Sequence, residues 1–155
     1  MKRIGQWLLC VIGVEAVGIL SGLLAGDIAA TYAKLDTPPF SPPGNIIGII
    51  WTVLYGLIGT ALFFILEAKT SKKVKNHALF LFFLQLLLNF IWSIVFFGAT
   101  NFWVGVVIVL LLLAVVLACL IYFYTIQKLA TFLFTPYFIW CVYAAYLAIG
   151  LAIKN

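Results

Sequence analysis

The stretch Val106-Val-Ile-Val-Leu-Leu-Leu-Leu-Ala-Val-Val-Leu-Ala-Cys-Leu120 decides the fold class, because it is apolar on every face. A transmembrane β-strand would instead alternate polar and apolar side chains over about 10 residues. The stretch lies inside a longer apolar segment, residues 102–124, and a helix that spans a bilayer needs about 20 mostly apolar residues. We therefore predict that the chain crosses a membrane as α-helices.

The rest of the chain has the same character, since 66% of its 155 residues are apolar and 8% are charged. Soluble domains are closer to half apolar and a quarter charged. We predict a single all-α transmembrane domain, a bundle of five helices over residues 5–26, 46–66, 78–98, 102–124 and 131–153. The first segment resembles a signal peptide, but it is longer than a typical h-region and lacks a clear cleavage motif, so we expect a retained helix.

The cations predict the orientation of the bundle. Seven of the nine fall on the side of the N-terminus, namely Lys2, Arg3, Lys69, Lys72, Lys73, Lys75 and Lys128, and the other two are Lys34 and Lys154. By the positive-inside rule, the N-terminus is cytoplasmic and the C-terminus is outside. We expect the basic face to contact anionic lipid and see no support for nucleic-acid binding.

The connection over residues 27–45 is the longest in the chain and contains four prolines, Pro38, Pro39, Pro42 and Pro43. Proline fixes φ and favours extended backbone before it, so we expect a stiff, shaped loop. The three cysteines, Cys10, Cys119 and Cys141, all lie in predicted spans and are expected to pack as small apolar residues. We predict no metal site, since the single histidine, His77, lies at the membrane edge.

One stripe of the third predicted helix combines amides with aromatic rings. Its members, at spacings that place them on one helical face, are Gln85, Asn89, Trp92, Ser93 and Phe96. Amides at membrane depth need partners. They could bond a neighbouring helix and hold the bundle together, or they could form the wall of a pocket for a flat apolar ligand with polar edges.

Two further stripes carry aromatic residues. On the fifth predicted helix the members are Trp140, Tyr143, Ala144, Leu147 and Leu151, and on the second they are Trp51, Tyr55 and Leu62. Aromatic residues near helix ends usually anchor the chain at the membrane interface. Trp92 and Trp140 lie several residues inside their spans, which favours an inner role for them.

Glu15 is a lone carboxyl in the first predicted helix. An ionisable residue within a span indicates function by default, here a proton or cation site, although a protonated acid bonded to a neighbouring helix is an equal alternative. The same helix has the spacing Gly18-x-x-x-Gly22-x-x-x-Gly26, which allows close helix contact within the bundle or in a dimer.

Three motifs in this order resemble the TspO/MBR family, the tryptophan-rich sensory proteins related to the mitochondrial translocator protein. The first is Tyr32-Ala-Lys-Leu-Asp-Thr-Pro-Pro-Phe-Ser-Pro-Pro-Gly44 with Trp51-Thr-Val-Leu-Tyr55. The others are Gln85-Leu-Leu-Leu-Asn89-Phe-Ile-Trp92-Ser93-Ile-Val-Phe-Phe97 and Pro136-Tyr137-Phe-Ile-Trp140-Cys-Val-Tyr143-Ala144. The resemblance covers essentially the whole chain.

The resemblance implies a five-helix bundle, often a homodimer, with a pocket roofed by the loop over residues 27–45. It implies a receptor or carrier for protoporphyrin IX, haem-like tetrapyrroles and hydrophobic drug-like ligands, with no required cofactor, in a bacterial cytoplasmic membrane. The implied ligand-binding residues are Tyr32, Pro42, Pro43, Trp51, Tyr55, Asn89, Trp92, Ser93, Trp140, Tyr143, Ala144 and Leu147. After Tyr146 the next cation is Lys154, so the cholesterol consensus is absent and porphyrin is the better expectation.

Two other functions stay open at this point. The resemblance also implies a possible enzyme that degrades protoporphyrin IX with light and oxygen, with Trp51 and Trp140 as candidate electron or radical partners. A proton-coupled cation exchanger built on Glu15 is the third hypothesis, and the fifth helix and the missing internal repeat disfavour it.

Overall fold

The computed structural model describes residues 2–155, and all regular structure in that range is helical. Its elements are α1 (Lys2–Ala25), α2 (Ile28–Ala33), α3 (Gly44–Glu67), α4 (Lys72–Ser93), the π-helical turn η1 (Ile94–Gly98), α5 (Phe102–Ile126) and α6 (Lys128–Lys154). Five of the helical segments are long and apolar enough to cross a membrane, with α4 and η1 together forming one of them. The predicted all-α, five-span fold is therefore confirmed.

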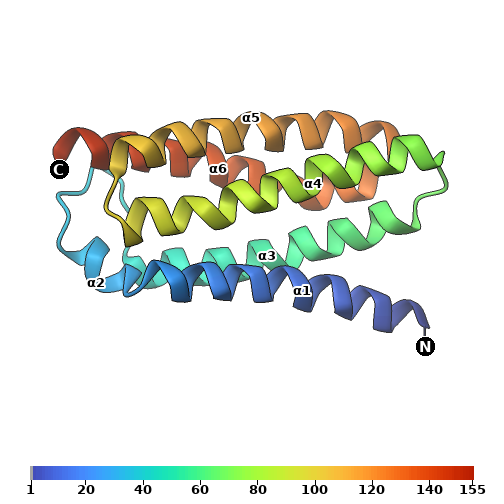
Figure 1. Cartoon of the computed structure of the whole chain (residues 1–155), viewed down its shortest axis with the longest axis horizontal. Coiled ribbons are helices and arrows are strands. Elements are labelled where there is room, and N and C mark those ends of the chain that lie inside the picture. The colour runs from blue at the N-terminus through green and yellow to red at the C-terminus, as the bar shows by residue number, and fades with distance from the viewer. Residues whose placement is uncertain (1) are drawn as a thin grey trace.

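The five spans form a ring around a common interior. Helix α1 packs against α3, α3 against α6, α6 against α5, α5 against α4, and α4 with η1 returns to α1. The pairs α4–α5 and α5–α6 are antiparallel neighbours, as their tight connections predict (Figure 1). The two chain ends lie at opposite ends of the bundle, and α2 lies at the end that holds the C-terminus (Figure 1).

Four helices begin earlier than the apolar pattern predicts, namely α1, α3, α4 and α6. Helix α4 starts at Lys72, where the Ser71 side chain accepts a hydrogen bond from the Val74 amide at 3.3 Å, and α6 starts at Lys128. The apolar pattern ends where the hydrocarbon layer ends, whereas backbone hydrogen bonding continues beyond it. The lysines at 72, 73, 75 and 128 therefore lie on helical turns and not in loops.

The connection over residues 27–45 contains the short helix α2, which the sequence analysis did not predict. Asp27 caps α2 by accepting a hydrogen bond from the Ala30 amide at 2.9 Å. Six residues are too few to show a helical period, so only the capping residue could have indicated it. The rest of the connection, residues 34–43, is called the roof loop below, and it turns at Pro39 and Phe40, where Phe40 has a φ of 62°.

The basic end of the bundle holds α1 firmly against α3. Arg3 forms an ion pair with Glu67, and the Trp7 indole N–H donates to the Thr60 hydroxyl at 3.1 Å. One turn of α1 beyond Trp7, Gly59 lets the α1 backbone approach so closely that a Cβ there would lie 2.6 Å from the Val11 Cα. This end collects the seven cations of the predicted cytoplasmic side, but the orientation itself stays a prediction.

The spaced glycines of α1, which are Gly18, Gly22 and Gly26, are not the positions at which the backbones of α1 and α3 approach closely. A Cβ added at Gly18 would strike the Tyr55 ring, at 2.3 Å from its Cε2 atom, while one added at Gly22 would meet nothing within 4 Å. Gly26 ends the helix with φ of 81°, a value that glycine adopts readily. The motif therefore receives an aromatic side chain at Gly18 and leaves open space at Gly22.

Gly59→Ala should destabilise the bundle by about 1–3 kcal/mol, because the added methyl group would overlap the backbone of α1. Thermal unfolding in detergent would measure the effect. Gly13→Ala is the matched control, since a Cβ there meets nothing within 4 Å, and its effect should stay within about 0.5 kcal/mol. Equal stability of the two variants would show that the close approach at Gly59 does not support the fold.

Candidate ligand-binding site

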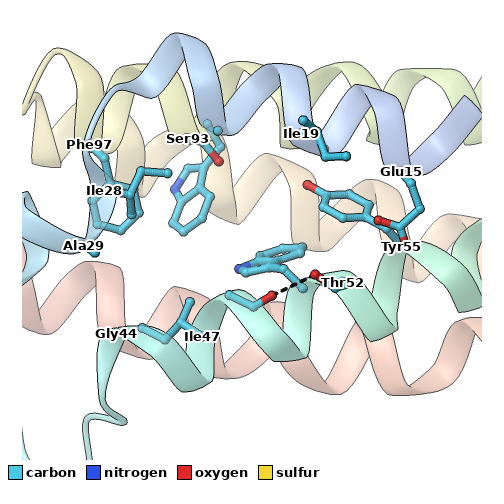
Figure 2. Close-up of a pocket in the computed structure, with 15 residues that line it drawn as sticks. Glu15, Ile19, Ile28, Ala29, Gly44, Ile47, Thr52, Tyr55, Ser93 and Phe97 are labelled. Carbon is cyan, nitrogen blue, oxygen red and sulfur yellow. Dashed lines mark hydrogen bonds between the residues drawn. The ribbon is translucent and has the colours of Figure 1, made fainter. Parts of the chain in front are cut away.

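A hollow of about 310 Å³ lies between α1, α3 and α4, at the end of the bundle that holds α2 (Figure 2). Helices α1 and α3 form its two sides, α4 and η1 form its back, and α2 closes one end. Ile19 of α1, which is 62% exposed, and the exposed Thr52 of α3 form its rim. The hollow therefore opens sideways between α1 and α3, toward the surrounding lipid.

Trp51 is the centre of the aromatic wall. Its ring stacks on Tyr55 with centroids 5.5 Å apart, and it lies 6.4 Å from Trp92 and 6.4 Å from Trp140. The three tryptophans come from α3, α4 and α6, so they join three helices of the ring. The sequence stripes predicted that these rings share the interior of the bundle, and the structure brings them together.

A second, much smaller hollow of about 30 Å³ lies next to the first and shares Trp51 and Trp92 with it. Helix α6 contributes its far wall. Of the implied ligand-binding residues, eight line one hollow or both, namely Tyr32, Trp51, Tyr55, Trp92, Ser93, Trp140, Ala144 and Leu147. Pro42, Pro43, Asn89 and Tyr143 line neither of the two.

Asn89 joins three helices, because both polar atoms of its amide bond tyrosines on other helices. Its Oδ1 accepts a hydrogen bond from the Tyr55 hydroxyl at 2.7 Å, and its Nδ2 donates to the Tyr137 hydroxyl at 2.8 Å. The residue is 1% exposed. Of the two interpretations that the sequence left open for the amides, the structure supports interhelical bonding for Asn89.

Tyr143 and Tyr146 of α6, and Asn155 directly after that helix, hold the roof loop in place. The Tyr143 hydroxyl donates to the Phe40 carbonyl at 2.6 Å, and the Tyr146 hydroxyl donates to the Pro39 carbonyl at 2.7 Å. Farther along, Asn155 accepts from the Asp36 amide at 3.0 Å and donates to its carbonyl at 3.2 Å. The stiffness expected from the prolines is thus reinforced by bonds to α6.

Pro42 and Pro43, two of the implied ligand-binding residues, contribute to the structure of the roof loop with their backbone. The Pro42 carbonyl accepts a hydrogen bond from the Tyr32 hydroxyl at 3.1 Å, which ties α2 to the loop. Pro43 occupies the capping position just before α3. Both residues therefore shape the end of the site where the chain enters α3.

Several buried polar atoms in residues 2–155 have no hydrogen-bond partner. They include the indole N–H groups of Trp92 and Trp140 and both amide atoms of Gln85. Trp92 and Trp140 line the smaller hollow, whereas Gln85 lines neither hollow. Buried donors are normally paired, so these two indole N–H groups are exceptions that lie beside the smaller hollow.

No three histidine, cysteine, aspartate or glutamate side chains gather to form a metal site anywhere in residues 2–155. His77 lies on the exposed first turns of α4, where its Nδ1 is 3.0 Å from the Lys73 carbonyl. It is far along α4 from Trp92 and Ser93, which line the hollow. Recognition of a flat ligand here would rest on shape, stacking and hydrogen bonds.

Comparison with known proteins agrees with the three sequence motifs. The profile of the TspO/MBR family matches residues 10–153. The chain belongs to the TspO/MBR family. It is 34% identical to the tryptophan-rich protein TspO of Archaeoglobus fulgidus over 146 residues, which cover 94% of each chain. It is also 31% identical to the human translocator protein over 126 residues, which cover 79% of this chain and 73% of the human protein.

The sequence predicted no ligand-binding role for the residues that make the hollow open, because the TspO/MBR motifs do not include them. Gly22 of α1 and Gly48 of α3 line it, and a Cβ at either would meet nothing within 4 Å. Glu15, noted in the sequence but not assigned to the site, also lines it. Their spacing from Gly18 and Trp51, at three or four residues, is the signal that could have found them.

The role of Asn89 can be tested by a mutant cycle. We expect Asn89→Leu to lower the free energy of unfolding by about 1–3 kcal/mol, because two buried tyrosine hydroxyls lose their partner. In a Tyr55→Phe, Tyr137→Phe background the same change should cost less, since no hydroxyl is stranded. Equal costs in both backgrounds, measured by chemical unfolding in detergent, would contradict the interhelical assignment.

Proposed function

We propose that this TspO/MBR protein binds a porphyrin or related flat tetrapyrrole in the membrane, as a receptor or carrier. The observation that supports it is the sideways-open hollow, which the Trp51 and Trp92 rings line together with Gly22 of α1 and Gly48 of α3. A glycine side lets a planar ring approach the helix backbone closely. Aromatic walls with few polar groups suit a flat, mostly apolar ligand.

The size of the hollow determines how such a ligand would sit. A volume of about 310 Å³ matches the lower end of sites for drug-sized molecules. A tetrapyrrole is larger, so it would enter edge-first between α1 and α3, stack on Trp51 and leave part of its ring in the lipid. The indole N–H groups of Trp92 and Trp140 are buried without a partner, so a carboxylate or carbonyl oxygen on the ligand would pair with them only after neighbouring side chains move.

Filling the hollow should weaken porphyrin binding. We expect Gly22→Leu to lower the affinity for protoporphyrin IX at least about tenfold, a loss of about 1.4 kcal/mol, because the new side chain occupies the ligand space without striking the protein. Fluorescence titration in detergent would measure it. Gly13→Leu is the control, since it adds the same side chain on α1 outside the hollow.

A Trp51→Phe, Trp140→Phe double variant should also bind protoporphyrin IX more weakly, since two stacking surfaces shrink. Unchanged affinity in both Gly22→Leu and this double variant would refute porphyrin binding at this site.

A second candidate function is light- and oxygen-dependent degradation of protoporphyrin IX. The observation in its favour is the contiguous set of indoles, with Trp51 at the hollow and Trp92 and Trp140 each 6.4 Å away. Such a set could pass an electron hole away from an excited ligand.

Illumination of the aerobic complex distinguishes a catalyst from a carrier. Catalysis predicts a new bilin-like absorbance that the Trp51→Phe, Trp140→Phe variant, at saturating porphyrin, does not produce. Bleaching at the rate of free porphyrin, with no new product, would remove this function and leave the binding proposal intact. The homodimer, the bacterial cytoplasmic membrane and the cytoplasmic N-terminus stay predictions beside both functions.

A further inference from the structure

Glu15 places a carboxyl group in the side wall of the hollow, deep within the span of α1. It is 13 residues beyond Lys2, the first residue of α1, and at 1.5 Å per residue this is about 20 Å along the helix. Figure 2 shows Glu15 at one end of the hollow and Ile28, Ala29 and Gly44 at the other. The acidic group therefore lies at the end of the hollow farther from α2.

The groups around Glu15 do not satisfy its carboxyl. The Tyr55 hydroxyl donates to Asn89, the Thr52 hydroxyl to the Gly48 carbonyl, and the Thr60 hydroxyl to the Gly56 carbonyl. Gly56 is the α3 residue that faces it, since a Cβ there would lie 3.7 Å from Glu15 Oε1. Each hydroxyl on this part of α3 thus already donates its proton elsewhere.

No cation compensates the carboxyl either. Within the part of the chain that the structure describes, the ion pair is Arg3 with Glu67 at the basic end, and none of the residues that line the hollow is lysine or arginine. A carboxyl without a partner at membrane depth is costly. It is stable there if a molecule in the hollow supplies the missing donor or positive charge.

We propose that Glu15 selects flat aromatic ligands that carry a protonated nitrogen, or another N–H donor, at the end that reaches deepest into the hollow. This inference rests on the proposed binding role of the hollow and names the ligand chemistry at one of its ends. The stacking surface of Trp51 holds the ring, and Glu15 accepts the hydrogen bond of the cationic group. A porphyrin would place its carboxylates at the other end of the hollow, away from Glu15.

Two dyes with the same ring system test the proposal. At neutral pH 9-aminoacridine is a planar cation, and acridine is its uncharged counterpart. With the full chain in phosphatidylcholine nanodiscs, wild type should bind 9-aminoacridine at least about tenfold more tightly than acridine, as expected for a hydrogen bond to a charged group. Glu15→Gln should reduce this preference to about twofold or less, and Glu15→Asp should retain part of it.

The controls separate local recognition from general attraction of cations. Asp36→Asn removes an exposed carboxylate in the roof loop, outside the hollow, and should leave the preference unchanged. Gly22→Leu should weaken the binding of both dyes. Glu15→Gln should unfold at the wild-type temperature in the same nanodiscs, which shows that the variant is folded.

The outcomes distinguish this inference from the proposed function. A wild type without preference, or a preference that survives Glu15→Gln, would overturn the role of Glu15 even if protoporphyrin IX binds. Loss of preference in Asp36→Asn as well would assign it to surface charge and equally overturn it. Failure of protoporphyrin IX to bind wild type, with the dye preference intact and dependent on Glu15, would refute the porphyrin proposal alone.

Discussion

The hydrogen-bonded chain Tyr55–Asn89–Tyr137 is the constraint around which the bundle is organised. It connects α3, α4 and α6 at the middle of the bundle. In the bilayer core no water is available to hydrogen-bond an unpaired polar group. Toward the basic end the interior is solid, with fully buried rings such as Phe82 and Phe134. Toward α2 the tryptophans replace them, and the interior opens into the two hollows.

The position of α1 explains why the opening lies where it does. At the basic end, the Arg3–Glu67 ion pair and the close approach at Gly59 hold α1 against α3. Farther along, the Tyr55 ring fills the space at Gly18, and beyond it Gly22 faces empty volume. Helix α1 is thus fixed against α3 at the basic end and kept at a distance from it by the Tyr55 ring at its middle. The gap that remains at the other end of α1 is the hollow.

The sequence was sufficient for the five spans and for the inner placement of Trp51, Trp92 and Trp140, because uninterrupted apolar runs and helical spacing are local properties. It could not assign Asn89, since an amide on an inner stripe has the same spacing whether it faces a ligand or a tyrosine on another helix. Nor could it show that the Tyr143 hydroxyl reaches the Phe40 carbonyl, because that bond joins residues 103 positions apart. These hydrogen-bond partners depend on how the helices pack against one another, and the sequence pattern of one helix does not determine that packing.

The hollow opens sideways between α1 and α3, so the protein would take up molecules that are dissolved in the bilayer and not in the surrounding water. In a bilayer the exposed rim residues of the hollow, Ile19 and Thr52, would contact acyl chains, while the roof loop is tied to α6. A guest molecule would thus be drawn from the pool dissolved in the bilayer, and its mole fraction among the lipids would govern occupancy. Extra lipid at a fixed total amount of guest would dilute that pool and empty the site, although nothing in the protein had changed.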